Sequence, residues 1–551
     1  MEKDIEQQGK KALKNPNHSD FEGINLVKKN GKTDNNKSLN PSIKPTNVEG
    51  HYPRFMLHGA VNLLQEDLRE LSIILESFVP HLDKIGIEIR QTNPLIKEII
   101  TGTEIFRRLK GISQVELLPF AFKQVPWFTR YTHSCLTYAF GDHVINKLQS
   151  KLNFNAADLD AAKLCFLIHD LGHGPFSHLT ERAFKKPRGR GGKIPKEYDH
   201  EYWTKILLNE LKDQLFDTNN NPYIQKKTST EEKYRLDVFS SAVQIISKDH
   251  KNIFVQLLSS QIDLDRLSNY LGDRIVVNAI LEEEGDIKNE KMVKALSSIN
   301  EVVDNIKRIL NSFVVLDRDE SANKCEPYLA IHEDAANPIM HYLLDRHIIR
   351  YYLLKHYRRE SANNVLEKIL LRAQYLVRNN ELASLGRTDL LIQTWLFGNH
   401  TEAEFVEMDD QLVFNQIRKW GKHTNDPILH DLTLRFTAHH FFCSYSCEKN
   451  NKPAKPNQEL INSIKTKVNN ELNTDITMYP KELITDYYFT YDETTSKPYH
   501  TDSDEVMIYT SEKKIKKLSS YIKDTKSELG YLLLNSEFER YLFIVPPEVE
   551  L

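Results

Sequence analysis

The sequence predicts a mostly α-helical protein with a smaller α+β region at its C-terminal end, and two patterns carry this prediction. Apolar residues recur at helical spacing up to about residue 400, in segments such as CLTYAFGDHVINKLQSKL and EYWTKILLNELKDQLF. Beyond that point, DYYFTYDE, EVMIYTSEKKIKKLSSYI and ERYLFIVPP cluster β-forming residues around turn residues. We therefore expect a helical domain over residues 51–400 and an α+β region over residues 401–551.

The first 50 residues differ in composition from the rest of the chain. They are rich in Lys, Asn, Asp, Gly and Pro and contain few apolar residues. Such a segment cannot offset the entropy lost on ordering, so residues 1–50 are expected to be disordered. The first helix is expected at residues 60–79, where AVNLLQEDLRELSIILESFV has helical periodicity.

The composition and charge of the chain indicate where the protein is located and which kinds of partner are not expected. The net charge is -4 over 551 residues, so no global field favours nucleic acid or an anionic membrane. The start, MEKDIEQQGKK, lacks the apolar stretch of a secretory signal, and no apolar run approaches the roughly 20 residues that span a bilayer. Five cysteines are too few for a disulfide framework and indicate reduced thiols. We expect a cytoplasmic protein with no membrane partner.

A basic, glycine-rich segment, KKPRGRGGKIPK, covers residues 185–196 and is expected to form a loop. A solvated linker is the simpler interpretation of such a charge run. The alternative is a loop that grips phosphates or single-stranded nucleic acid, and its position directly after the motif described next favours that alternative.

The most specific motif is LIHDLGHGPFSH, residues 167–178. An apolar helix, AAKLCFLI, leads into the pair His169-Asp170. The glycines and the proline that follow predict a tight turn, which would fold His173 and His178 back toward the pair. An ionisable pair at the end of a buried helix is costly unless it is satisfied, and a divalent metal would satisfy it.

Two further segments complete a candidate metal site. RYTHS supplies His133, and SSQIDLDRL supplies Asp263 and Asp265 at the start of another helix. Mixed histidine and carboxylate ligands suit Mn, Fe, Zn or Mg, so the ligand types do not fix the metal. A single histidine on an apolar helix is more often a core residue than a ligand, so the prediction depends on all three segments together.

These three segments, RYTHS, HDLGHGPFSH and IDLDRL, resemble the HD-domain deoxynucleoside triphosphate triphosphohydrolases. This family includes the bacterial dGTP triphosphohydrolases and the vertebrate enzyme that joins an HD domain to a sterile alpha motif. The resemblance runs from about residue 90 to about residue 375. It implies an HD phosphohydrolase core that uses a divalent metal to hydrolyse dNTPs to deoxynucleoside and triphosphate. It also implies a homo-oligomer with nucleotide effector sites, and it suggests a role in antiviral or antiphage defence.

The resemblance assigns roles residue by residue. The expected metal ligands are His133, His169, Asp170 and Asp265. The expected catalytic residues are His173, His178, Glu181 and His200, with His178 as the proton donor and Glu181 as its acidic partner. The expected substrate contacts are Gln114, Arg130, Arg266, Arg346 and Asp273.

The sequence departs from the family after Asp265. The family usually has Asp-Tyr where this chain has Ser268-Asn269, and Tyr270 stands one step later. Gly272 replaces the usual arginine before Asp273, and Leu354 replaces a tyrosine two residues before His356. Because the family's tyrosine faces the deoxyribose, discrimination against ribonucleotides and the base preference stay open. Tyr270 is the candidate sugar contact.

Two other functions remain as alternatives. The same metal site could serve an HD-type phosphodiesterase or phosphatase acting on another nucleotide, including a signalling nucleotide. The chain could also be a nucleotide-sensing or nucleic-acid-binding protein. Separately, AHHFFCSYSC would place His439, Cys443 and Cys447 on one helical face, which allows either a second, soft-metal site or simple core packing.

Overall fold

The computed structural model describes fifteen parts of the chain: residues 25–28, 84, 94–122, 125, 127–151, 154–186, 192–216, 228–247, 253–283, 296–316, 328–354, 356–450, 452–472, 480–501 and 505–551. The helix expected at residues 60–79 lies outside these residues. Within them the fold is mostly α-helical with an α+β C-terminal part, so the predicted fold class is confirmed.

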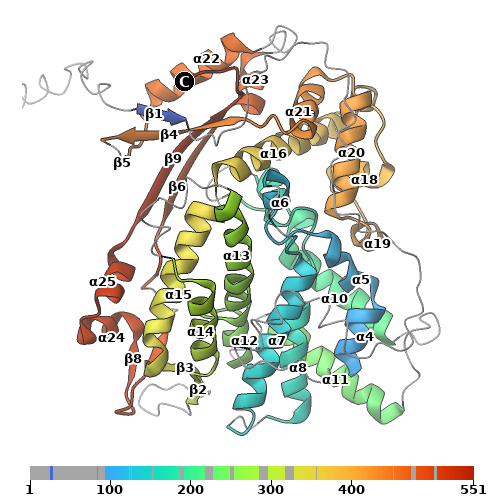
Figure 1. Cartoon of the computed structure of the whole chain (residues 1–551). Helices are drawn as coiled ribbons and strands as arrows, with labels where there is room; N and C mark the ends of the chain where they lie inside the picture. The colour runs from blue at the N-terminus through green and yellow to red at the C-terminus, as the bar shows by residue number, and fades with distance from the viewer. Residues whose placement is uncertain are drawn as a thin grey trace, which may run out of the picture.

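Four long helices form the centre of the helical part and position the site. Helix α7 packs against both α8 and α13, and α8 packs in turn against α11. Figure 1 shows α7, α8 and α13 running alongside one another below α6. Their bounds are Arg130–Leu148 for α7, Ala156–Ile168 for α8, Ser229–Ile246 for α11 and Leu264–Glu283 for α13. The predicted anchor helix α8 is buried on all sides along Leu164–Ile168, as its continuous apolar run requires.

Other helices surround this centre in the first two thirds of the chain. Before and after α7 and α8 they are α4 (Pro94–Gly102), α5 (Glu104–Arg107), η2 (Arg108–Gly111), α6 (Leu118–Ala121), α9 (His178–Phe184), η3 (Lys196–Tyr198), α10 (His200–Phe216) and α12 (Ile253–Leu258). After α13 they are α14 (Ile299–Leu310), η7 (Glu333–Ala335), α15 (Ala336–Ile348), the π-helical turn η8 (Ile349–Leu354) and α16 (Tyr357–Arg378).

The remaining helices follow α16. They are α17 (Leu382–Leu385), α18 (Leu390–Phe397), α19 (Glu402–Val406), α20 (Asp410–His423), α21 (Pro427–Thr437), α22 (Gln458–Glu471), α23 (Lys481–Tyr488), α24 (Leu518–Thr525) and α25 (Glu528–Asn535). Helices α18, α20 and α21 lie together at one end of α16 (Figure 1). No helix in the described parts is long and apolar enough to cross a membrane.

Two small sheets flank the helices. The first has the order β1-β4-β9-β6, with β5 paired to β4, and all of its pairs are antiparallel. The second has the order β2-β3-β7-β8, and its β3-β7 pair is parallel. The strands are β1 (Asn25–Lys28), β2 (Phe313–Leu316), β3 (Tyr328–His332), β4 (Cys443–Lys449), β5 (Lys452–Pro453), β6 (Thr490–Ser496), β7 (Met507–Tyr509), β8 (Ile515–Lys517) and β9 (Phe538–Val545).

The strands do not follow the expected division at residue 400. Strands β2 and β3 come from the part expected to be helical, and β3 pairs with β7 from the C-terminal part. The first 37 residues after the division are still mainly helical, since 401–437 contain α19, α20 and α21. Each sheet draws its strands from both sides of residue 400. The division into domains stays a prediction.

Strand β1 departs from the expected disorder of residues 1–50. Residues Asn25–Lys28 pair with β4, with Leu26 opposite Cys447. Leu26 packs against the hydrophobic core. Pairing along the edge of β4 satisfies the backbone groups of this short segment, which its composition alone did not predict.

The helix expected for AHHFFCSYSC is wrong. Cys443 and Cys447 lie on strand β4, where four residues span about 13 Å, too far for both to reach one metal. His439 lies in the preceding turn with φ of 56° and stacks on Phe120 with ring centroids 4.4 Å apart. The thiols are buried in the core, so of the two interpretations the structure favours core packing.

Candidate active site

The HDLGHGPFSH motif forms a tight turn between α8 and α9, as predicted. Phe176 and Ser177 both adopt the left-handed region, with φ of 56° and 52°. Gly172, in this turn, lies against the first residue of α10. A Cβ on Gly172 would be 2.1 Å from the carbonyl oxygen of His200. A glycine is therefore required for α10 to approach the turn, and this approach brings His200 beside the motif.

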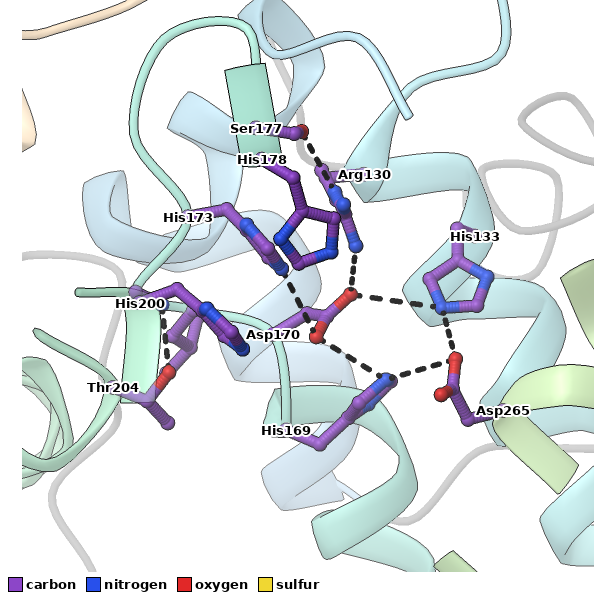
Figure 2. A network of polar contacts seen from close by, with 12 residues as sticks. Arg130, His133, His169, Asp170, His173, Ser177, His178, His200, Thr204 and Asp265 are labelled. Carbon is purple, nitrogen blue, oxygen red and sulfur yellow. Dashed lines mark hydrogen bonds and ion pairs between the residues drawn. The ribbon is translucent and has the colours of Figure 1, made fainter. Parts of the chain in front are cut away.

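Three segments that are far apart in the sequence bring a cluster of two histidines and an aspartate together. His133 lies on α7, His169 follows the last residue of α8, and Asp265 lies in the first turn of α13. Asp265 Oδ1 is 2.9 Å from His133 Nε2 and 3.7 Å from His169 Nε2. In Figure 2 the two rings and the carboxylates of Asp170 and Asp265 face a common centre. This cluster could hold a metal ion.

The donor atoms of this cluster fit a divalent cation. His169 Nδ1 donates to the carbonyl oxygen of Phe166 at 3.0 Å, so in the neutral ring it is Nε2 that carries the lone pair. The Nε2 atoms of His133 and His169 are both buried without a well-directed hydrogen bond. Burial opposes protonation of His169, yet Asp170 and Asp265 raise its pKa to about 9. Lone pairs and negative potential converging on one point are what a cation requires.

Asp170 lies between this cluster and an arginine. Its Oδ2 accepts a hydrogen bond from Arg130 at 2.6 Å and lies 3.6 Å from His133 Nε2, while its Oδ1 lies 3.6 Å from His169 Nε2. Arg130 is fixed in turn, because its Nε donates to Ser177 Oγ at 3.0 Å. The fourth expected ligand is thus adjacent to the other three, and Arg130 orients its carboxylate.

A second cluster contains the four expected catalytic residues. Glu181 Oε2 accepts from His178 Nδ1 at 2.7 Å, and Glu181 Oε1 accepts from His200 Nδ1 at 2.5 Å. Burial opposes ionisation of Glu181, but the hydrogen bonds from these two histidines outweigh it and hold its pKa well below the usual range. The bond to Glu181 likewise outweighs burial at His200 and raises the pKa of that imidazole. Both histidines therefore keep a proton on Nδ1.

His173 completes the second cluster and differs from its neighbours. Its ring stacks on His200 at 4.3 Å with an interplanar angle of 5°. Burial, together with the positive charge of Arg130, lowers the pKa of His173 well below its usual value. Both oxygens of Glu181 are already occupied by hydrogen bonds, and Arg130 is close. The arrangement is therefore better suited to moving a proton than to holding a second cation.

Of the expected phosphate contacts, Arg346 acts on the expected contact residue Asp273. Burial raises the pKa of Asp273 to about 7, against the opposing effect of Arg346, Arg350 and Arg359. Arg350 was not among the predicted residues, although it follows Arg346 by one helical turn, a spacing that could have revealed it. Desolvation of the guanidinium and the positive charge of Arg346 lower the pKa of Arg350, although the residue as a whole is exposed.

Arg266 contacts the residues that immediately precede its own helix, α13. It donates to the carbonyl oxygen of Ser260, and its Nε lies 3.5 Å from Asp263 Oδ2. Asp263 accepts from the backbone N–H groups of Ser260 and Arg266 at 3.0 and 2.7 Å, so it caps α13 and is absent from the metal-binding clusters among the described residues.

The segment after Asp265 is arranged differently from the expectation. Tyr270 is buried, and its hydroxyl donates to Asp345 at 2.6 Å, so this tyrosine points away from the site. Asn269 instead lies at the site: its Nδ2 donates to Asp265 Oδ1 at 3.0 Å, and its Oδ1 accepts from Gln114 Nε2 at 2.8 Å. The expected contact residue Gln114 is thus joined to the metal cluster through Asn269.

Two carboxylates that sequence reasoning missed support the motif. Asp410, at the start of α20, accepts the backbone N–H groups of Ser113 and Phe176 at 2.9 and 2.6 Å. Glu116 accepts from both terminal nitrogens of Arg182, on α9, at 2.7 and 2.8 Å. No local sequence signal marks either residue, because each acts through contacts made only in the folded chain.

The ends of the basic segment 185–196 are joined. The backbone groups of Lys186 and Lys193 form two hydrogen bonds of 3.0 and 2.7 Å across an antiparallel bridge. The loop expected there is therefore closed at its base, and residues 187–191 lie outside the described parts.

The chain was compared with protein families, with curated proteins and with solved structures. No family model matches the chain. The uncharacterised protein YwfO of Bacillus subtilis is 24% identical over 362 residues, covering 65% of this chain and 70% of YwfO. The human deoxynucleoside triphosphate triphosphohydrolase SAMHD1 is 32% identical over 102 residues, which cover 17% of this chain and 15% of SAMHD1.

The structural comparison extends much further along the chain. A phosphohydrolase from Bacteroides thetaiotaomicron superposes with a TM-score of 0.60 at 19% identity, covering 82% of this chain and 96% of that structure. The two proteins therefore share a fold. The shared fold, the partial sequence similarity and the His/Asp cluster together support the HD phosphohydrolase superfamily.

Proposed function

We propose that this protein is a metal-dependent hydrolase that converts deoxynucleoside triphosphates to deoxynucleoside and inorganic triphosphate. The observation that carries the proposal is the juxtaposition of two clusters. The buried Nε2 atoms of His133 and His169 face Asp265. The second cluster, with His178 and His200, lies next to them (Figure 2). The partial similarity to SAMHD1, whose name gives that activity, supports the choice of substrate.

The first cluster would bind the cofactor. His133, His169, Asp170 and Asp265 would hold a divalent ion such as Mn, Fe, Mg or Zn. When bound, such an ion polarises a phosphate and lowers the pKa of a bound water. Arg130 holds the Asp170 carboxylate in place through the 2.6 Å contact, so that its oxygens stay turned toward the histidines.

The second cluster would handle the leaving group. Attack of water at the α-phosphorus breaks the bond to the 5′-oxygen of the nucleoside, and that oxygen needs a proton to leave. His178 would supply it, since Glu181 orients its ring through Nδ1 as a carboxylate orients imidazole in other dyads. His200 shares Glu181 with His178 and would return a proton to the pair.

The arginines would bind the triphosphate. A nucleoside triphosphate carries about four negative charges near neutral pH, and guanidinium groups bind phosphate oxygens in a fork. Arg266, Arg346 and Arg350 would neutralise this charge, and the positive charges of Arg346, Arg350 and Arg359 act on Asp273.

Product analysis tests the proposal. The full chain is incubated with each dNTP and each rNTP in the presence of Mn²⁺, Mg²⁺, Fe²⁺ or Zn²⁺, with and without a second nucleotide as activator. Intact triphosphate and deoxynucleoside are expected, and the double substitution of His169 and Asp170 by alanine should abolish both. Release of orthophosphate or pyrophosphate alone would contradict the proposal.

A second candidate is hydrolysis of another nucleotide by the same metal site. The position of Asn269 favours it: a small amide joined to Gln114 lies at the site, while Tyr270 points into the core. The same panel, extended to cyclic and signalling nucleotides, separates the two. A ribonucleotide or phosphodiester turned over at least as fast as every dNTP would favour this second function.

The resemblance also leads us to propose assembly into a homo-oligomer regulated by nucleotides, with defence against viruses or phages as the biological setting. Sedimentation of the chain with and without dNTP tests the assembly. A monomer under both conditions would contradict it.

A further inference from the structure

Ser268 lies on α13 one helical turn after Asp265, and it is next to His133, a predicted metal ligand. It is fully buried, and its Oγ is 3.2 Å from His133 Nδ1, the ring nitrogen opposite the one that faces the cluster. We propose that Ser268 is a positioning residue that fixes the tautomer of His133, so that Nε2 presents its lone pair to the metal. The inference rests on the proposed function only in requiring a metal at this cluster.

The direction of the hydrogen bond follows from the other partners of Ser268. Its hydroxyl has one proton, and it donates to the carbonyl oxygen of Asp265 at 2.8 Å. Thr137 Oγ1 lies 2.7 Å away on α7 and is the other oxygen with which Ser268 exchanges a hydrogen bond. With its proton given to the Asp265 carbonyl, Ser268 presents a lone pair to the imidazole at 3.2 Å, and His133 Nδ1 then donates to it.

The tautomer decides whether His133 can act as a ligand. A neutral imidazole carries one proton, and the nitrogen that carries it cannot bind a metal. With the proton held on Nδ1 by Ser268, Nε2 is free, and it lies 2.9 Å from Asp265 Oδ1. With the proton on Nε2, an N–H group would point at the position of the cation. Ser268 removes this second arrangement.

His169, the other histidine of the cluster, has the equivalent support from a backbone carbonyl, that of Phe166. The ring of His133 is supported from a neighbouring helix instead, through the 3.2 Å contact of its Nδ1 with Ser268 Oγ. The side chain on α13 takes that place. One helix therefore supplies both a ligand, Asp265, and the group that orients a second ligand.

Binding of Mn²⁺ to the full chain, measured by calorimetry without nucleotide, tests the inference. Ser268→Thr keeps a hydroxyl and Ser268→Val has the same shape without it, so the comparison isolates the hydrogen bond. Loss of a group that orients a metal ligand typically weakens metal affinity by about 10- to 100-fold. We expect this loss for the valine variant relative to the threonine variant, and a threonine variant close to the wild type.

Ser134→Ala is the matched control. Ser134 follows His133 on α7 and is equally buried, and its hydroxyl has no hydrogen-bond partner in the described structure. This variant should bind Mn²⁺ as the wild type does. Visible spectra of the Co²⁺-loaded variants give a second readout, because a changed ligand field is expected for Ser268→Val and not for Ser134→Ala.

The outcomes separate this inference from the proposed function. Equal Mn²⁺ affinity in Ser268→Val and Ser268→Thr would overturn the role of Ser268, and if the valine variant does not fold, Ser268→Ala takes its place in the comparison. A wild-type chain that binds no Mn²⁺ or Co²⁺ would overturn the metal site and the inference with it. A chain that binds Mn²⁺ as expected but hydrolyses no nucleotide would contradict the proposed function and leave the role of Ser268 standing.

Discussion

Asp410 Oδ1 accepts the backbone N–H of Phe176 at 2.6 Å. Through this bond, a carboxylate at the start of α20 holds the left-handed turn that carries the candidate proton donor His178. Its other oxygen accepts the N–H of Ser113 at 2.9 Å, beside the expected contact residue Gln114. A left-handed conformation at a residue other than glycine costs about 1–3 kcal/mol and persists only where the surroundings enforce it. Asp410 is one source of that enforcement.

Substituting Asp410 by alanine should therefore affect both stability and turnover. Two buried N–H groups lose their acceptor, which should lower the free energy of unfolding by about 1–3 kcal/mol for each group. The turn is expected to relax, so that kcat falls while KM changes little. Urea denaturation and steady-state kinetics measure the two effects.

Asp409→Ala is the control for this experiment. Asp409 caps the same helix by accepting the N–H of Leu412 at 2.7 Å, but it has no hydrogen bond to the turn. Loss of the cap should cost about 1 kcal/mol and leave kcat unchanged. If both variants lose kcat to the same degree, the turn is not what Asp410 supports.

Glu181→Gln should strongly reduce turnover. A glutamine has one acceptor oxygen, so it cannot accept from both His178 and His200, and the orientation of one ring is lost. General acid catalysis typically contributes about 10²- to 10⁴-fold, and we expect kcat to fall within this range with little change in KM. Glu210→Gln, on the same helix as His200, is the control. Retention of more than half of the wild-type kcat in Glu181→Gln would rule out the proposed proton donor pair.

The pairing of His200 with Glu181 predicts a pH-dependent stability. Since the folded pKa of His200 is raised, its contribution is fully present below the unfolded value of about 6.5 and is lost as pH rises through the folded pKa. The Tm of the wild type should exceed that of His200→Asn by more at pH 6 than at pH 9. Thermal denaturation across this range checks the sign. A difference that stays constant or grows with pH would contradict the pairing.

Arg350→Ala should weaken binding of the triphosphate. The positive charge of Arg346 acts on Arg350, and a polyanion between these arginines would relieve the repulsion. We expect KM for the nucleoside triphosphate to rise about tenfold, the loss of roughly 1.4 kcal/mol of binding free energy. Arg308→Ala, at the end of α14, removes a similar charge elsewhere. An unchanged KM in Arg350→Ala would exclude this residue from the phosphate site.

Much of the helical fold was predictable, because long amphipathic or apolar segments have a period that can be read locally. The anchor helix α8 is one example. The short strands were not predictable. The segment that ends in NIKRILNSF reads as helical to Phe313, yet α14 ends at Leu310 and β2 begins at Phe313. Strand β3 is five residues long and pairs with β7 from far along the chain, so no local period marks it.

In the candidate site too, residues in a contiguous motif were predictable, and contacts between segments far apart in the sequence were not. The expected ligands His133, His169, Asp170 and Asp265 adjoin one another, and the motif that suggested them is contiguous in the sequence. The residues that orient them were not predictable. From the sequence, Ser268 was only a departure from the family's usual Asp. Its hydrogen bonds connect it to His133 and Asp265, and only the packing of α7 against α13 reveals this.

The distance in sequence between the turn and Asp410, which holds it, has a consequence for biosynthesis. Phe176 and Asp410 are 234 positions apart, and a ribosome that adds 5–20 residues per second needs about 12–47 seconds to pass from one to the other. During that interval the nascent chain contains the histidine motif without the carboxylate that holds its turn. We therefore expect the motif to reach its final geometry late, after α20 has emerged, and a chain truncated before residue 410 to leave the turn untethered.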